Sequence, residues 1–193
     1  MTLLVSGLAL FFLVHMVPTR PLVRAGLVDA LGARIYRALF AILAAAGLVL
    51  IVLGYGAMQG LGRGNPQLWV PPPWIKHVVF LLMIPAIILL VAAFVPSRIR
   101  TAVRHPMLVA LFIWAFAHLL ANGDLASLLL FGSFLAFAVY DQISVMTREA
   151  PGPLGSARGG SPQDMIVIAA GLALYALLLF WGHAKLTGVA LLP

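Results

Sequence analysis

Six blocks of apolar residues, nearly free of charged side chains, constrain this chain more than any other feature. They cover residues 2–17, 35–58, 74–95, 106–121, 125–143 and 164–184. Most approach the roughly 20 residues that a helix needs to cross a bilayer core. In lipid each block must be helical, because an open strand would leave backbone polar groups unpaired. The sequence therefore predicts an all-α fold, a polytopic transmembrane bundle of about six helices.

Composition and charge agree with this prediction. Charged residues make up 9% of the 193 residues, against about 25% in a soluble domain. The basic residues lie in short loops and form no basic face with interleaved aromatics, so we expect a lipid bilayer and no nucleic acid as the partner. The chain has no cysteine, which excludes disulfides, thiolate metal sites and cysteine nucleophiles. No second soluble domain or repeat is evident, so we expect one transmembrane domain over residues 1–193.

The loops on the two sides of the predicted bundle differ in their number of Lys and Arg residues. Of the 12 Lys and Arg residues, all but Arg63, Lys76 and Lys185 lie in the first, third and fifth loops. The positive-inside rule then places these three loops in the cytoplasm and both termini outside. The first block has no basic residues ahead of it, which favours an N-out anchor over a cleaved signal. This block is expected to end near Val17 or to continue as a kinked helix past Pro18 and Pro21.

His15 and His118 are the first candidates for chemistry, because an ionisable residue inside a membrane is a functional hypothesis by default. At 1.5 Å per residue, His15 lies about 20 Å below the outer start of its block, and His118 about 18 Å above the inner start of its block. Both fall in the middle third of a core about 30 Å thick. Three interpretations stay open: a shared metal or haem with both as ligands, a proton relay, and substrate hydrogen bonding. His77, His105 and His183 lie at block ends, where interfacial or hydrogen-bonded roles are expected.

Arg104, His105 and Pro106 begin the fourth block and predict an anion site. A helix start offers free N–H groups and the positive end of the helix dipole. Arg20, Arg98 and Arg100 lie on the same side of the membrane in the predicted topology. Haem propionates, a phosphate-bearing cofactor and lipid headgroups are the candidate ligands.

The stretch Asn122-Gly123-Asp124 predicts a tight turn between two blocks. Gly123 is expected to allow a positive φ, and Asp124 to cap the fifth block. The blocks hold no paired carboxylates, so carboxylate acid–base catalysis and di-iron sites are not expected.

Three groups of motifs in this chain resemble those of NnrU-type membrane proteins. The motifs are Leu13–Arg20 with Tyr36-Arg37, Arg104–Met107 with Trp114–Asp124, and His183–Val189. The resemblance covers essentially the whole chain. It implies a bacterial inner-membrane protein linked to denitrification or nitric-oxide metabolism.

The NnrU family is in turn similar to the plant 15-cis-ζ-carotene isomerase, a membrane haem b protein with histidine axial ligands. That similarity implies haem b as cofactor, His15 and His118 as iron ligands, and cis–trans isomerisation of a polyene as the reaction if the chain is an enzyme. Where the isomerase has a cysteine, this chain has Ala115, so the resemblance does not carry over a thiolate ligand.

Two other functions stay open. One is a non-enzymatic haem-based sensor of nitric oxide or an electron-transfer protein. The other is a membrane methyltransferase of the isoprenylcysteine or phospholipid type, which shares the Arg-His-Pro motif. Those methyltransferases carry an acidic pair and a tyrosine-rich stretch for S-adenosylmethionine, whereas this chain has only Glu149 and a Gly/Pro-rich loop after the fifth block.

Overall fold

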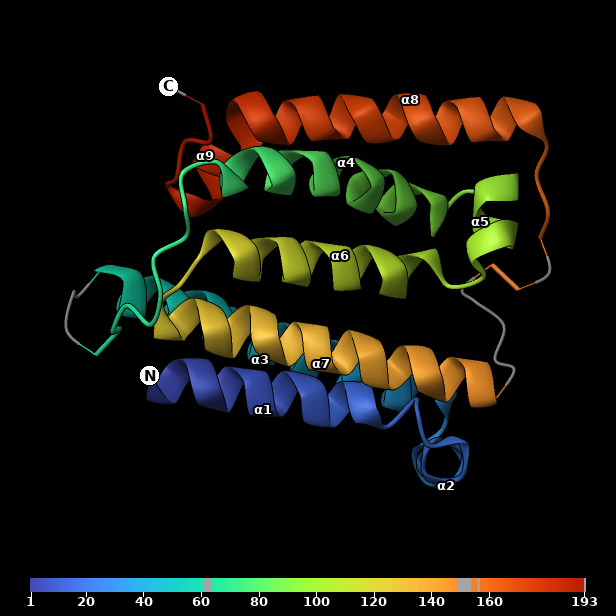
Figure 1. Ribbon diagram of the computed structural model, residues 1–193. Coiled ribbons are helices and arrows are strands. Elements are labelled where there is room, and N and C mark those ends of the chain that lie inside the picture. Colours follow the sequence, from blue (N-terminus) through green and yellow to red (C-terminus); the bar gives the residue numbers. More distant parts are fainter. Residues whose placement is uncertain (61–63, 149–153, 156, 193) are drawn as a thin grey trace. The chain divides into compact units, whose positions relative to one another are not determined.

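The computed structural model of the protein is built almost entirely of helices (Figure 1). It describes residues 1–60, 64–148, 154–155 and 157–192, so Arg63, used above for the orientation, lies outside the described residues. The elements in chain order are α1 (Thr2–Met16), α2 (Pro21–Leu31), α3 (Ala33–Gly60), α4 (Ile75–Ala92), α5 (Arg98–Val103), α6 (Pro106–Ala121), α7 (Leu125–Thr147), α8 (Ser161–Leu177), the π-helix η1 (Leu178–Gly182) and α9 (His183–Thr187). The all-α prediction is confirmed.

Each predicted apolar block corresponds to a helix. In the described part of the chain, α3, α4, α7 and the continuous stretch Ser161–Thr187 are long and apolar enough to cross a membrane. Helices α1 and α2 pass the same test together but are bent by 89°, and α6 is apolar but only 16 residues long. The chain is therefore a multi-pass membrane protein.

The first span ends where its prolines begin. Helix α1 stops at Met16, and α2 starts at Pro21, where a proline suits the first helical position. Further inside a helix, a proline lacks the N–H of the helical hydrogen bond and clashes with the preceding turn. The alternative of a kinked continuation is wrong, because α2 is a separate helix nearly perpendicular to α1.

The helices group into two compact units. Unit 1 comprises Met1–Pro71 and Asn122–Phe137, and unit 2 comprises Pro72–Ala121 and Ala138–Pro193. Each unit is described by itself. One domain over residues 1–193 stays a prediction.

In unit 1, glycine lets α1 and α3 approach backbone to backbone. A Cβ on Gly7 would lie 2.6 Å from the backbone nitrogen of Ile51. A Cβ on Gly54 would collide with the backbone nitrogen of Leu4. Small residues serve this purpose in membranes because helix association there relies on close van der Waals contact.

In unit 2, α4 packs against both α6 and α8 (Figure 1). A Cβ on Gly171 of α8 would lie 2.8 Å from the Cα of Ile88 on α4. The Tyr175 hydroxyl donates to the Phe80 carbonyl at 3.2 Å. Close backbone approach and this hydrogen bond together fix α8 on α4.

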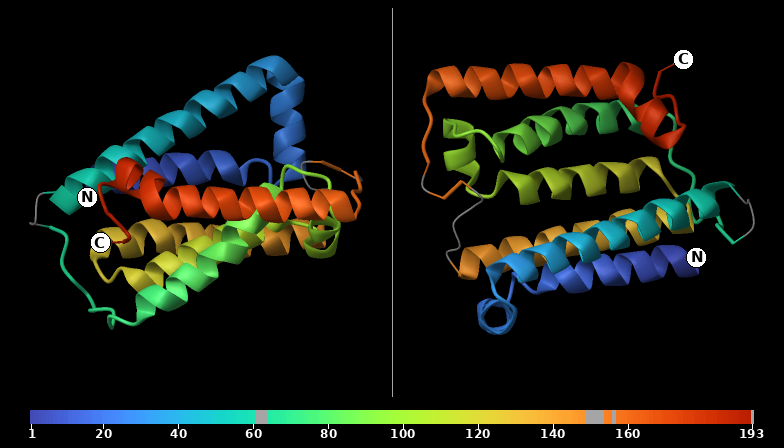
Figure 2. Two further views of the ribbon diagram at one scale, coloured as in Figure 1. Left: turned by 90° about the horizontal axis from the view of Figure 1, so that it is seen from above. Right: turned by 180° about the vertical axis from the view of Figure 1, so that it is seen from behind.

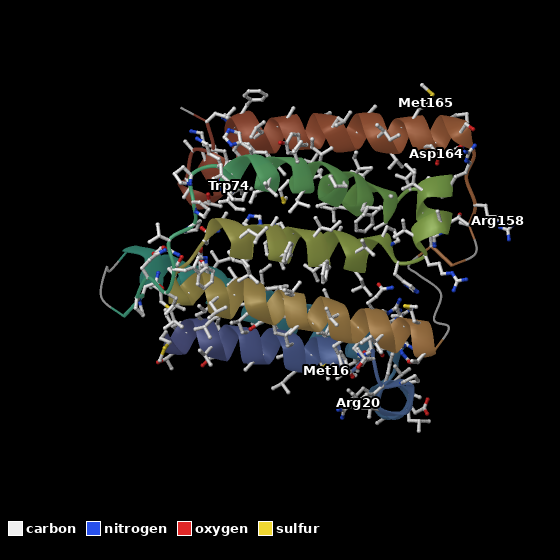
Figure 3. The ribbon with its side chains drawn as sticks, in the orientation of Figure 1. Met16, Arg20, Trp74, Arg158, Asp164 and Met165 are labelled. Atoms are coloured by element: carbon white, nitrogen blue, oxygen red, sulfur yellow. The ribbon has the colours of Figure 1, made fainter. Side chains whose placement is uncertain are left out.

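Short helix α5 is tied to the segment that leads into α8. Asp164, labelled in Figure 3 at the start of α8, accepts from the Arg98 backbone N–H at 2.7 Å and pairs with the Arg98 guanidinium at 3.2 Å. The buried Arg100 guanidinium donates to the carbonyls of Gly155 (2.9 Å) and Ala157 (2.8 Å). Arg98 and Arg100, two arginines of the predicted anion site, therefore bind residues of the segment that leads into α8.

Candidate functional site

The predicted site residues are divided between the two units. His15 and Arg20 belong to unit 1, whereas His118, Arg104 and His105 belong to unit 2. Within unit 2, Arg104 and His105 lie together as chain neighbours between α5 and α6.

His15 lies in the last turn of α1 among phenylalanine rings. Its ring stacks on Phe11 with 4.0 Å between centroids and meets the rings of Phe40 at 5.2 Å and Phe137 at 6.1 Å. Its Nδ1 lies 2.7 Å from the Phe11 carbonyl oxygen. Since a carbonyl can only accept, Nδ1 carries the hydrogen and Nε2 presents the lone pair. Nε2 is therefore the nitrogen able to act as a ligand.

Tyr36 adds a polar atom to the same end of unit 1. Its hydroxyl is buried and has no hydrogen-bond partner among the described residues. Its ring lies 6.3 Å from that of Phe40, which in turn contacts His15, and the Arg24 guanidinium lies 6.0 Å from its ring centre. A buried hydroxyl without a partner is costly, so each such group needs an explanation. Apart from the presence of Tyr36 in the first motif, no sequence feature indicated this buried hydroxyl.

His118 repeats the hydrogen-bonding pattern of His15. Its Nδ1 lies 2.8 Å from the Trp114 carbonyl oxygen, four residues earlier in α6, and the two rings are 5.1 Å apart. The same tautomer follows, with the lone pair on Nε2. Metal-ligating histidines usually donate their other N–H to a carbonyl or carboxylate, which fixes the tautomer and the ring orientation. Both predicted ligands have this second partner.

Arg104 and His105 join α5 to α6 in an unusual conformation. Arg104 has φ of 62°, a region that non-glycine residues rarely adopt, and it is exposed. His105 is buried, and this burial lowers the pKa of its imidazole. The Asp141 carboxylate opposes that shift, while the guanidiniums of Arg104, Arg148 and Arg100 add to it. His105 therefore lies among three cations and one anion.

Asp141 and Gln142 of α7 were not among the predicted residues. Asp141 Oδ1 lies 3.6 Å from the Arg148 guanidinium, an ion pair longer than a hydrogen bond. Gln142 Oε1 is buried and accepts no hydrogen bond within the described part of the chain. The sequence could have indicated Asp141 as a candidate site residue, because it is an acidic residue inside a predicted span. The negative charge of Asp141 makes the surroundings of His105 less cationic than predicted.

The turn before α7 is a capping structure in unit 1. Asp124 Oδ1 accepts from the backbone N–H of Ser127 (3.0 Å) and from the amides of Gln59 (3.1 Å) and Asn65 (3.0 Å). Asp124 Oδ2 accepts from the Ser127 hydroxyl at 2.7 Å. The predicted cap is confirmed, and it also binds residues that lie about 60 positions away in the chain.

Gly123 is needed here for a reason other than the predicted one. Its φ is not positive, so the expectation of a left-handed turn is wrong. Instead its carbonyl accepts from the N–H groups of Leu68 (2.7 Å) and Trp69 (3.1 Å), and a Cβ would collide with the Trp69 carbonyl oxygen. Glycine permits this close approach of two backbones.

Asp124→Ala is expected to lower the free energy of unfolding by about 1–3 kcal/mol, because the cap is lost and its donors are left without an acceptor. Burial alone would raise the pKa of the Asp124 carboxyl, but hydrogen bonds from Ser127 and Asn65 outweigh it and hold the pKa below its ordinary 3.8. Its stabilising effect is therefore complete above that value and is lost as the pH falls through the lower folded pKa. Thermal unfolding in detergent from neutral to acid pH measures this, with Asp124→Asn as control. Parallel curves for wild type and Asp124→Asn would contradict the linkage.

The remaining histidines have the hydrogen-bonded roles expected of them. His77 Nδ1 lies 3.2 Å from the Trp74 carbonyl oxygen, and His183 Nδ1 lies 2.8 Å from that of Val189. The Thr187 hydroxyl is 3.1 Å from His183 Nδ1. In the described ranges, no three or more His, Cys, Asp or Glu side chains are placed to hold a metal ion.

Comparison with known families gives one match. The family model described as "NnrU protein" matches residues 3–191, nearly the whole chain. No curated protein and no solved structure matches the chain.

Proposed function

Because this chain belongs to the NnrU family, and because two of its membrane histidines share one hydrogen-bonding pattern, we propose that it binds haem b with His15 and His118 as axial ligands. The observation that carries the proposal is the Nδ1–H that each histidine donates to the carbonyl four residues earlier. Because Nδ1 of each imidazole is engaged in this hydrogen bond, Nε2 would be the nitrogen that binds iron as an axial ligand.

The other residues present also fit haem. A haem carries apolar ring edges and two carboxylates. The phenylalanine rings around His15 suit the ring edges, and the buried Tyr36 hydroxyl is a donor without a partner in the described residues. Arg20, Arg104 and His105, which lie at helix boundaries, are the proposed partners of the carboxylates.

The reaction we propose is cis–trans isomerisation of an apolar polyene. Bound haem would supply an iron whose coordination changes with its redox state. The chain would admit the substrate from lipid and hold it in an apolar environment such as the rings of Phe11, Phe40 and Phe137. Sensing of nitric oxide would use the same haem. Adding nitric oxide or an apolar polyene to the purified protein distinguishes sensing from isomerisation.

The absorption spectrum of the wild-type protein tests the proposal. Protein purified from haem-replete cells is expected to show a Soret band and, on reduction, the sharp visible bands of six-coordinate haem b. Absence of haem would overturn the proposal. Absence of haem together with tight binding of S-adenosylmethionine would support the methyltransferase instead.

The orientation is part of this proposal. The excess of Arg in the first, third and fifth loops supports a bacterial inner-membrane protein with both termini outside. Reporter fusions after residues 62, 100 and 155 are expected to read outside, inside and inside. The reverse pattern would invert the topology.

A further inference from the structure

Helix α2 runs across the direction of its neighbours in unit 1. It is bent by 89° from α1, and a view at right angles to that of Figure 1 shows it crossing between the ends of α1 and α3 (Figure 2). Gly32, with φ of 79°, ends α2 and lets the chain turn into α3. For an α1 that crosses the bilayer, this bend directs α2 along the membrane surface. Its 11 residues are also too few to span a bilayer.

One side of α2 is apolar and exposed. Leu22 is 89% exposed, and Val23, Leu27 and Leu31 are also exposed. At about 100° per residue, these four side chains occupy roughly half of the helix circumference. Exposing four such apolar side chains of one short helix to water would be energetically unfavourable.

The other side of α2 faces α3. Val28 is half-buried, and the Arg24 guanidinium lies 6.0 Å from the centre of the Tyr36 ring of α3. Both residues lie in the half of the circumference opposite Val23. The apolar side is therefore turned away from the protein of unit 1.

Arginines flank this apolar side. Arg20, Arg24, Arg34 and Arg37 are all exposed, and Asp29 is the one acidic residue between positions 20 and 37. Figure 3 labels Arg20 directly before α2. Short helices with an apolar face and basic residues bind at the lipid headgroup boundary, most strongly on anionic membranes.

We propose that α2 is a surface helix that binds anionic phospholipids. Leu22, Val23, Leu27 and Leu31 enter the acyl boundary, and Arg34 and Arg37 contact headgroup phosphates. The proposal rests on the bend, the exposure and the charge of α2, and it stands whether or not the chain binds haem.

Spin labels on single cysteines test the depth of α2. The natural chain has no cysteine, so Leu27→Cys and Leu31→Cys can be labelled without further changes. Asp29→Cys is two positions from each, about 160° around the same helix, and is the matched control. In vesicles of phosphatidylcholine with phosphatidylglycerol, labels at 27 and 31 are expected to be accessible to oxygen and protected from an aqueous nickel chelate, and the label at 29 the reverse. Labels at 27 and 31 that the chelate reaches as readily as the label at 29 would overturn the proposal. Labels that neither reagent reaches would also overturn it, because protein would then cover this face.

The lipid charge is tested separately with the Leu27 label. In vesicles of phosphatidylcholine alone, the label is expected to be less deeply inserted. Each Arg→Gln change at positions 34 and 37 is expected to lower the ratio of inserted to exposed label in anionic vesicles about fivefold. Arg158→Gln, distant in the sequence from α2, is expected to leave the ratio unchanged. Equal insertion in both kinds of vesicle would overturn binding of anionic lipid.

Discussion

The double variant His15→Ala/His118→Ala is expected to be purified without haem, whereas the wild type carries it. Each single variant is expected to lose one axial ligand, which moves the Soret band and lowers haem retention more than about tenfold. This magnitude is a minimum, because losing only an outer-shell partner of a ligating histidine already costs about 10–100-fold in metal affinity. Absorption spectra and haem content per chain measure both effects.

His183→Ala and His77→Ala are the matched controls. His77 is exposed, His183 is half-buried, and both use Nδ1 in local hydrogen bonds, so their variants are expected to keep the wild-type spectrum. If the single variants at 15 and 118 kept that spectrum, the ligands would have to be reassigned among His77, His105 and His183. A Tyr36→Phe variant that lowered haem retention without moving the Soret band would place Tyr36 at the haem periphery.

Gly54→Ala is expected to lower the free energy of unfolding by about 1–3 kcal/mol, the usual range for overpacking. The new Cβ would meet Leu4 Cα at 2.6 Å, and this contact is with backbone, which cannot rotate away as a side chain would. Helices α1 and α3 must therefore separate and lose their close contact. Unfolding in mixed detergent micelles measures the change.

Gly56→Ala is the control within the same helix. Nothing lies within 4 Å of a Cβ at Gly56, and the residue is exposed. This variant is expected to be neutral or stabilising by up to about 1 kcal/mol, because alanine is the better helix former. Equal effects of the two substitutions would contradict the close approach of α1 to α3.

Helix positions could be predicted from the sequence because the signal is local. A run of apolar residues long enough to cross a bilayer must be helical wherever it packs. The cap at Asp124 could also be predicted, since a cap involves residues three positions apart. The roles of Gln59 and Asn65 could not, because their amides reach Asp124 from a distant part of the chain.

The site was predictable to a lesser degree. Depth along a helix singled out His15 and His118, but the carbonyl partner of each Nδ1 depends on the side-chain rotamer. Arg98 and Arg100 were counted as anion-binding because sequence gives their charge and not their partners. Asp141 was passed over because its distance in sequence from His105 hides their electrostatic contact in unit 2.

The sequence by itself determined that this chain is a multi-pass helical membrane protein of the NnrU family, since hydropathy, helix length and motif content are properties of contiguous residues. Only the tertiary structure decided that α2 leaves the direction of α1 by 89°, because proline forbids a continuous helix but does not set the angle of the next one. It also decided that Gly7 and Gly54 are the contact residues of α1 and α3, because many small residues lie in these blocks and only packing selects which face is buried.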